Sequence, residues 1–126
     1  MNARLLISVV DDDESVRESL PELLRELGFT ARTFSSAEEF LKSDAALQSS
    51  CLMLDVAMPA MSGPELSREL RRRKVGIPVV FITASRDESA RSRLLDDGAV
   101  ECLFKPFSAI ALLQALNKAI GGKQKF

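Results

Sequence analysis

The sequence predicts an α/β fold in which five parallel strands alternate with five helices. Five short apolar segments, typical of buried strands, recur along the 126 residues. Between them lie longer stretches whose apolar residues repeat at helical spacing. Because parallel strands need a long right-handed crossover, this alternation indicates one parallel sheet with helices on both faces.

Each expected element follows from a local pattern. The strands are expected at residues 5–10, 30–34, 51–54, 79–82 and 100–104. The helices are expected at residues 14–27, in a short segment after residue 36, and at 64–74, 87–97 and 108–120. Gly28 and Gly98 are natural helix ends. Pro21 is expected to bend the first helix or to loosen its first turns. Ser36 is expected to cap the short helix, with Glu39 as its capping-box partner.

Composition narrows the classes of function. The 17 basic and 18 acidic residues give a net charge of −1, so the overall charge provides no footprint for nucleic acid. Apolar residues make up 46%, which suits one core, and residues 1–120 are expected to be one domain. Residues 121–126 look like the start of a linker or a C-terminal tail. The absence of histidine excludes Ser-His and Cys-His nucleophilic pairs and histidine-containing zinc sites.

The expected location is cytoplasmic. No apolar stretch approaches the length of a membrane span, and residues 1–4 do not read as a signal peptide. Cys51 and Cys102 each lie in an apolar segment, where buried thiols are expected rather than a disulfide. Reduced thiols of this kind fit a cytoplasmic protein.

Three consecutive aspartates, Asp11, Asp12 and Asp13, follow the first expected strand directly. Like charges placed together disfavour one another's ionisation, and a bound divalent cation offsets that cost. The simpler interpretation is that the aspartates only cap the next helix, but one carboxylate is enough for that. We expect Asp13 to be the residue that serves the helix.

The other expected strands also end in polar residues: Asp55 after the third, Thr83 after the fourth and Lys105 after the fifth. The C-terminal ends of parallel strands meet at one edge of the sheet, which is where ligands bind in open α/β folds. Carboxylates make a hard oxygen site suited to Mg²⁺. A lysine and a hydroxyl suit a phosphoryl group.

Four motifs at these strand ends resemble those of the bacterial response-regulator receiver domain, in the same order and spacing. They are Val-Val-Asp-Asp-Asp at residues 9–13, Leu-Asp-Val-Ala-Met-Pro-Ala-Met-Ser-Gly at 54–63, Phe-Ile-Thr-Ala-Ser at 81–85 and Phe-Lys-Pro-Phe at 104–107. The resemblance covers the whole chain. It is strongest to receivers of the nitrogen-fixation regulator type, which precede a helix-turn-helix output domain.

The resemblance implies a flavodoxin-like (βα)5 doubly wound fold with strand order 2-1-3-4-5. It implies that Asp55 is the phosphoacceptor and takes a phosphoryl group from a sensor histidine kinase. Lys105 would pair with Asp55 and later with a phosphoryl oxygen, and Thr83 would hydrogen-bond another phosphoryl oxygen. Lys105-Pro106 resembles the cis peptide bond of the family.

The resemblance also implies an Mg²⁺ site. Asp12 would be its main carboxylate, with Asp11 acting partly through water. Asp55 and the backbone carbonyl of Ala57 would complete the protein ligands. Without metal, the clustered carboxylates should raise at least one pKa, while Lys105 opposes that rise.

The implied function is a phosphorylation-dependent switch in a two-component system rather than an enzyme, with no direct contact to nucleic acid. The face formed by helix 87–97, strand 100–104 and helix 108–120 would repack to control a homodimer or a C-terminal output domain that regulates transcription. Candidates on that face are Arg91, Leu94, Leu95, Cys102, Phe104, Leu112 and Ala115.

One departure and two alternatives remain open. Cys102 occupies the position where the family carries an aromatic residue that follows the threonine, and Phe104 and Phe107 are near it without being aligned. The first alternative is a pseudo-receiver that binds partners without phosphorylation. The second is a small Mg²⁺-dependent aspartyl phosphotransferase, although 126 residues leave little room for a lid and a substrate pocket.

Overall fold

The computed structural model describes residues 4–121, which form one five-stranded parallel sheet. The strands are β1 (Leu6–Val10), β2 (Thr30–Phe34), β3 (Cys51–Asp55), β4 (Val79–Thr83) and β5 (Glu101–Phe104). Their order is β2-β1-β3-β4-β5, and every neighbouring pair is parallel. The predicted flavodoxin-like topology is therefore confirmed. It places β3 at the centre, so that strand has hydrogen-bonded neighbours on both sides.

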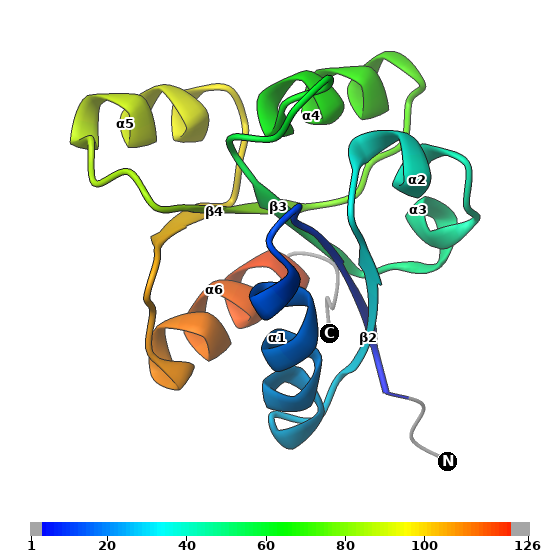
Figure 1. The fold of residues 1–126 in the computed structure, drawn as a ribbon, viewed down its shortest axis with the longest axis vertical. Coiled ribbons are helices and arrows are strands. Elements are labelled where there is room, and N and C mark those ends of the chain that lie inside the picture. Colours follow the sequence, from blue (N-terminus) through cyan, green and yellow to red (C-terminus); the bar gives the residue numbers. More distant parts are fainter. Residues whose placement is uncertain (1–3, 122–126) are drawn as a thin grey trace.

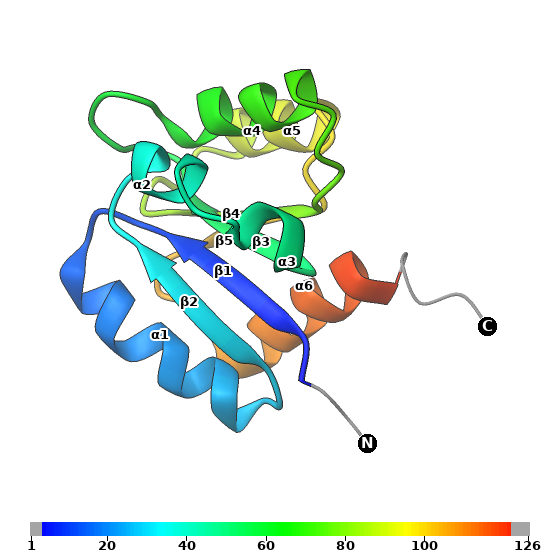
Figure 2. The same cartoon turned by 90° about the vertical axis from the view of Figure 1, so that its right-hand side faces the viewer.

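Helices cover both faces of the sheet (Figures 1 and 2). They are α1 (Glu14–Glu26), α2 (Ala37–Leu41), α3 (Ala45–Gln48), α4 (Gly63–Arg72), α5 (Glu88–Asp96) and α6 (Ala109–Gly121). One hydrophobic core lies between the sheet and helices α1 and α6. The other lies between the sheet and helices α2, α3 and α4, with half-buried Leu94 of α5 at its border.

The described residues contain six helices, so the prediction of five was wrong. The segment after Ser36 is divided at Ser43. The Ser43 hydroxyl donates to the carbonyl of Phe40 in α2 and accepts from the backbone N–H of Ala45, the first residue of α3. A serine that satisfies both helix ends competes with continuation of the helix, which is why the chain turns here.

The predicted caps are partly correct. Ser36 Oγ accepts from the backbone N–H of Glu39 at 3.1 Å, as expected. The Glu39 carboxylate, however, accepts from the N–H and hydroxyl of Ser35 rather than completing the box with Ser36. Helix α1 begins at Glu14 and continues through Pro21, so its first turns are formed despite the proline.

Two further expectations concern the cysteines and the chain ends. Cys51 and Cys102 are both buried, on opposite faces of the sheet, so they cannot form a disulfide with each other. Of the expected linker at residues 121–126, only Gly121 is described, and it ends α6.

Within residues 4–121, no helix combines the length and the apolar character that a membrane crossing requires.

Phe40 anchors the short helix α2 on the sheet, and its removal should destabilise the fold. Its side chain is fully buried and meets Phe34 edge-to-face, with ring centres 5.3 Å apart. We expect Phe40→Ala to lower the free energy of unfolding by about 3–5 kcal/mol, measured by urea denaturation. Leu47→Ala in neighbouring α3 is the control, because Leu47 is 83% exposed and should change stability by about 0.5 kcal/mol or less. Similar losses in both variants would contradict this account of the core.

Candidate functional site

Three carboxylates meet at the C-terminal edge of the sheet. Asp11 and Asp12 follow β1, and Asp55 ends the adjacent strand β3. One carboxylate oxygen of each residue lies within 4.8 Å of the others. Asp11 is fully buried and Asp55 is 6% exposed, whereas Asp12 lies at the surface. The parallel sheet thus brings together the acidic residues that the sequence predicted as one site.

Lys105 supplies positive charge to this cluster from the end of β5. Its Nζ donates to Asp11 Oδ2 at 2.9 Å and forms a longer ion pair with Asp55 Oδ1 at 3.6 Å. The predicted ion pair with Asp55 is therefore present, and the shorter hydrogen bond to Asp11 is a contact that was not predicted. The Asp11 carboxylate is fully buried and has lost its hydrating water, so it needs a hydrogen-bond partner more than the slightly exposed Asp55 carboxylate does. This difference explains why Lys105 lies closer to Asp11.

Burial and the neighbouring charges change the pKa of Asp55 and the pKa of Lys105. Burial and then the charge of Asp11 raise the pKa of Asp55 from 3.8 to about 7, although Lys105 opposes the rise. Burial disfavours the Lys105 ammonium, but its hydrogen bond to Asp11 and the charges of Asp11, Asp55 and Asp13 outweigh that cost and raise its pKa. Near neutral pH the site therefore holds a cationic lysine beside a carboxylate that is only partly ionised.

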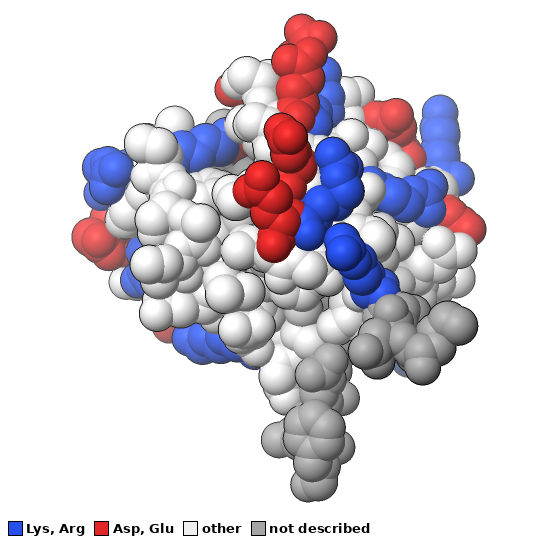
Figure 3. Space-filling model, turned by 90° about the horizontal axis from the view of Figure 1, so that it is seen from below, with Lys and Arg blue, Asp and Glu red and all other residues white. Residues whose placement is uncertain are grey.

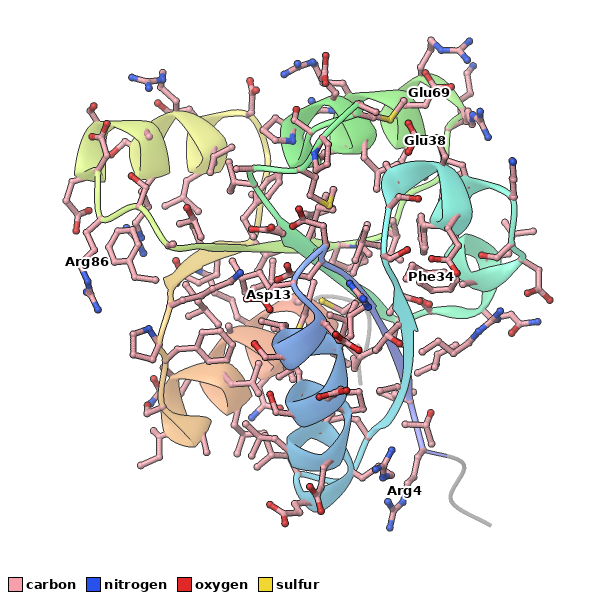
Figure 4. The ribbon with its side chains drawn as sticks, in the orientation of Figure 1. Arg4, Asp13, Phe34, Glu38, Glu69 and Arg86 are labelled. Carbon is pink, nitrogen blue, oxygen red and sulfur yellow. The ribbon has the colours of Figure 1, made fainter. Side chains whose placement is uncertain are left out.

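Asp13 belongs to α1, as predicted. Its carboxylate accepts from the backbone N–H of Ser15 at 2.9 Å and from the Ser15 hydroxyl at 2.8 Å, so it is the N-cap of the helix. These hydrogen bonds lower the pKa of Asp13. Figure 4 shows Asp13 where α1 begins, beside the edge of the sheet. The backbone N–H of Asp13 also donates to Asp11 Oδ1 at 2.9 Å, so the start of the helix helps to hold the metal-site candidate Asp11.

Thr83 ends β4 and is half-buried. Its hydroxyl oxygen accepts from the backbone N–H of Ser85 at 3.1 Å, and its carbonyl accepts from the backbone N–H of Lys105 at 2.7 Å. Thr83 is therefore tied to the lysine through the backbone and to the loop before α5 through its side chain. The Lys105-Pro106 peptide bond is cis, as the resemblance implied.

An aromatic side chain lies beside Thr83, but it is Phe104 and not residue 102. Phe104 pairs with Thr83 in the register of β4 and β5 and is half-buried. The guanidinium of Arg86, labelled in Figure 4, lies 5.6 Å from the Phe104 ring centre. Cys102 is 3% exposed in the core under α4 and α5, where burial raises the pKa of its thiol.

The loop between β3 and α4 carries Ala57, whose carbonyl was a predicted metal ligand. The loop is tied at both ends: the Val56 N–H donates to the Ile82 carbonyl at 3.1 Å, and the Gly63 N–H donates to the Val56 carbonyl at 2.9 Å. Ala57 itself is exposed and lies two residues after Asp55 in the chain. Its carbonyl remains a predicted ligand.

Sequence reasoning missed Arg17. Its guanidinium donates to the backbone carbonyl of Asp11 at 2.8 Å, from one turn inside α1. The available signal was its place four residues after the cap Asp13, because helical spacing turns such a side chain back toward the start of the helix. Arg17 thus fixes the backbone of the buried Asp11 through this hydrogen bond.

An apolar groove of about 610 Å³ adjoins the site. It lies between α1 and the segment that follows β5, and it is lined by Val16, Ser19, Leu20, Leu23, Lys105, Pro106 and Phe107. Figure 3, seen from below Figure 1, shows acidic side chains in a row over α1 and a largely uncharged surface next to it. Lys105 is shared by the groove and the carboxylate cluster.

Comparisons with known proteins point to one family. The sequence profile of the response regulator receiver domain matches residues 7–117. Nodulation protein W of Bradyrhizobium diazoefficiens is 40% identical over 118 residues, which cover 94% of this chain and 52% of that protein. The transcriptional regulatory protein FixJ of Azorhizobium caulinodans is 36% identical over 121 residues, covering 96% of this chain and 57% of FixJ. The chain thus spans about half the length of these curated relatives.

A solved structure agrees with these relatives. The crystal structure of FixJ-N is 33% identical and has a TM-score of 0.87, with 99% of this chain and all of that chain covered. The predicted resemblance to receivers of the nitrogen-fixation regulator type is therefore confirmed at the level of both sequence and fold.

The raised pKa of Asp55 predicts an unusual dependence of stability on pH. Asp55 binds its proton more tightly in the folded protein, where its pKa is about 7, than in the unfolded chain, where it is 3.8. The stability of the wild type should therefore fall as pH rises from about 4 to about 7. We expect Asp55→Asn to be more stable than the wild type by about 2 kcal/mol at pH 8 in metal-free buffer.

The measurement is urea unfolding of both proteins at several pH values in the presence of a chelator. The difference between them should shrink steadily as pH falls toward 4, because protonated aspartic acid and asparagine are both neutral. A difference that is the same at pH 4 and pH 8 would show that Asp55 ionises normally.

Proposed function

The chain belongs to the response regulator receiver family, and from that premise we propose that Asp55 accepts a phosphoryl group and so controls a signalling switch. The observation that carries the proposal is the gathering of Asp11, Asp12, Asp55 and Lys105 at one edge of the sheet. A buried carboxylate with a raised pKa is a stronger nucleophile than an ordinary one, provided that it is ionised when it reacts.

The residues present fit a bound Mg²⁺. The candidate ligands are carboxylate oxygens, which are the hard ligands that Mg²⁺ prefers, and together they carry more negative charge than Lys105 can neutralise. We propose that Asp11, Asp12, Asp55 and the Ala57 carbonyl hold the ion. Bound Mg²⁺ would neutralise charge on the phosphoryl oxygens.

The side chains of Asp55, Lys105 and Thr83 would carry out the transfer and bind the phosphoryl group. A carboxylate oxygen of Asp55 attacks the phosphorus in line, while the bond from phosphorus to the nitrogen of the donor histidine breaks. The product is an acyl phosphate on Asp55, which water later hydrolyses. Lys105 first stabilises the ionised carboxylate and then binds a phosphoryl oxygen, and the Thr83 hydroxyl binds another.

The switch would begin at Thr83. When its hydroxyl turns to the phosphoryl group, it releases the N–H of Ser85 and draws in the loop that leads to α5. Helix α5 has no buried side chain, so shifting it breaks few apolar contacts. We propose that movement of α5 changes the face formed by α5, β5 and α6, which then controls a homodimer or an output domain.

Burial revises the residues expected on that face. Cys102, Leu112 and Ala115 were candidates for partner contacts, but each is at most 3% exposed and packs in the core. Arg91 and Leu95 are half-buried and remain accessible. We therefore expect partner contacts on this face to be made by half-buried side chains such as Arg91 and Leu95.

We propose a sensor histidine kinase as the donor and an output domain after the receiver. The donor must reach Asp55, and the apolar groove beside Lys105 offers it a surface continuous with the site. FixJ is a transcriptional regulatory protein of which the matched segment covers 57%, and this supports a transcriptional output beyond residues 1–120. The cytoplasmic location and the lack of direct nucleic-acid contact remain predictions.

Phosphorylation can be tested directly. Incubation with Mg²⁺ and acetyl phosphate should add the mass of one phosphoryl group to the wild type, measured on the intact protein. Asp55→Asn should gain none, because the amide is not a nucleophile. Asp96→Asn, a change of the same kind on exposed α5, should behave as the wild type. Absence of added mass in the wild type, when a control receiver is modified, would favour a pseudo-receiver.

The same preparation separates a switch from an enzyme. A switch should be modified once and should not release phosphate from small phosphate esters in many turnovers. Sustained hydrolysis that is lost in Asp55→Asn would favour the aspartyl phosphotransferase.

The aspartate triplet contains its own matched control for metal binding. Asp12→Ala should weaken Mg²⁺ binding about tenfold or more, measured by titration calorimetry, because it removes a proposed ligand. Asp13→Ala should retain Mg²⁺ affinity but lose about 1 kcal/mol of stability, because it removes the N-cap of α1. Equal losses of affinity in the two variants would show that only the total negative charge matters.

A further inference from the structure

Gly63 occupies a position where only glycine fits. It is the first residue of α4 and is buried. A Cβ atom at this position would overlap the backbone carbonyl oxygen of Asp55, and it would lie 3.1 Å from the Phe81 ring. A flexible side chain could move out of the way, but the first obstacle is the backbone of the phosphoacceptor. The start of α4 therefore lies directly against Asp55.

Neither partner in this contact can yield easily. Asp55 ends the central strand β3, and the next residue, Val56, is hydrogen-bonded to β4 through the Ile82 carbonyl. On the other side, a complete capping box holds the first turn of α4. The Ser62 N–H donates to Glu65 Oε1 at 2.8 Å, and the Glu65 N–H donates to Ser62 Oγ at 3.3 Å.

The same contact closes the loop that carries Ala57. The Gly63 N–H donates to the carbonyl of Val56, so the loop starts and ends at one point beside Asp55. If the start of α4 moved outward, this hydrogen bond would lengthen and the loop would open. The carbonyl of Ala57 would then move relative to the carboxylates of Asp11 and Asp55.

We propose that Gly63 is a positioning residue for the phosphoacceptor and for the metal ligands, an inference that rests on the proposed function. Gly63 has no side chain to offer as a ligand, and it would act through the backbone of Asp55 and the loop 57–62. A methyl group at position 63 forces a displacement, and a misplacement of about 1 Å costs on the order of a hundredfold in rate.

The test compares three variants with the wild type. Gly63→Ala introduces the methyl group at the contact. Gly76→Ala is the matched control, because a Cβ atom there meets nothing within 4 Å. Leu70→Ala destabilises the far end of the same helix by removing a buried side chain. Each protein is measured for Mg²⁺ affinity by calorimetry, for the rate of modification by acetyl phosphate and for stability in urea, under conditions where all are folded.

Gly63→Ala should bind Mg²⁺ at least about tenfold more weakly and react at least about tenfold more slowly. Gly76→Ala and Leu70→Ala should stay within about twofold of the wild type in both measurements, although Leu70→Ala is less stable. Wild-type affinity and rate in Gly63→Ala would overturn the proposal. So would equal losses in Leu70→Ala, because these would trace the effect to general instability.

If Gly63→Ala does not fold, Ser62→Ala tests the same contact. Ser62→Ala loosens the same end of α4 at a cost of about 1 kcal/mol, and it should show the same loss of Mg²⁺ affinity in smaller measure. Wild-type affinity in Ser62→Ala would then overturn the proposal. If the wild type itself takes no phosphoryl group, the proposed function fails, while the Mg²⁺ measurements still decide whether Gly63 positions the acidic site.

Discussion

The organisation of this domain depends on one electrostatic constraint: two buried carboxylates, Asp11 and Asp55, share one lysine at the edge of a parallel sheet, and a third carboxylate, Asp12, lies beside them. Asp11 is fully buried and takes the hydrogen bond of Lys105, so Asp55 is left with a longer ion pair. Burial and then the charge of Asp11 raise the pKa of Asp55 more than Lys105 lowers it. Such a site is incompletely neutralised within the protein. Its charge balance favours a bound cation and makes the state of Asp55 responsive to what binds beside it.

The backbone keeps this unfavourable cluster in place. The central strand β3 is paired on both sides, and Asp55 ends it, so the backbone of Asp55 cannot move away without breaking the sheet. Arg17 and the start of α1 hold the backbone and side chain of Asp11. Gly63 lets α4 lie against Asp55 from the remaining side. The repulsion is thus balanced by hydrogen bonds and close packing around the site.

The switch requires a part that moves, and packing differs around the sheet. Helices α1, α2, α3, α4 and α6 all contribute buried side chains to one of the two cores, whereas α5 contributes none. Helix α5 is attached by the half-buried Leu94 and by polar contacts of Arg91 with the carbonyl of Cys102 and with Glu101. Because α5 has no fully buried side chain, its displacement costs less apolar burial than displacement of its neighbours.

The strands, their parallel arrangement and the residues at their ends could be predicted from the sequence, because abrupt changes from apolar to charged residues are local signals. The sequence also assigned Asp13 to the start of the following helix, and the family resemblance supplied the strand order. Two features are visible only in the folded chain: Lys105 hydrogen-bonds Asp11, and a Cβ atom at Gly63 would overlap the backbone of Asp55. Both depend on how strands and helices distant in sequence pack together, and differences of less than 1 Å in that packing leave no local pattern in the chain.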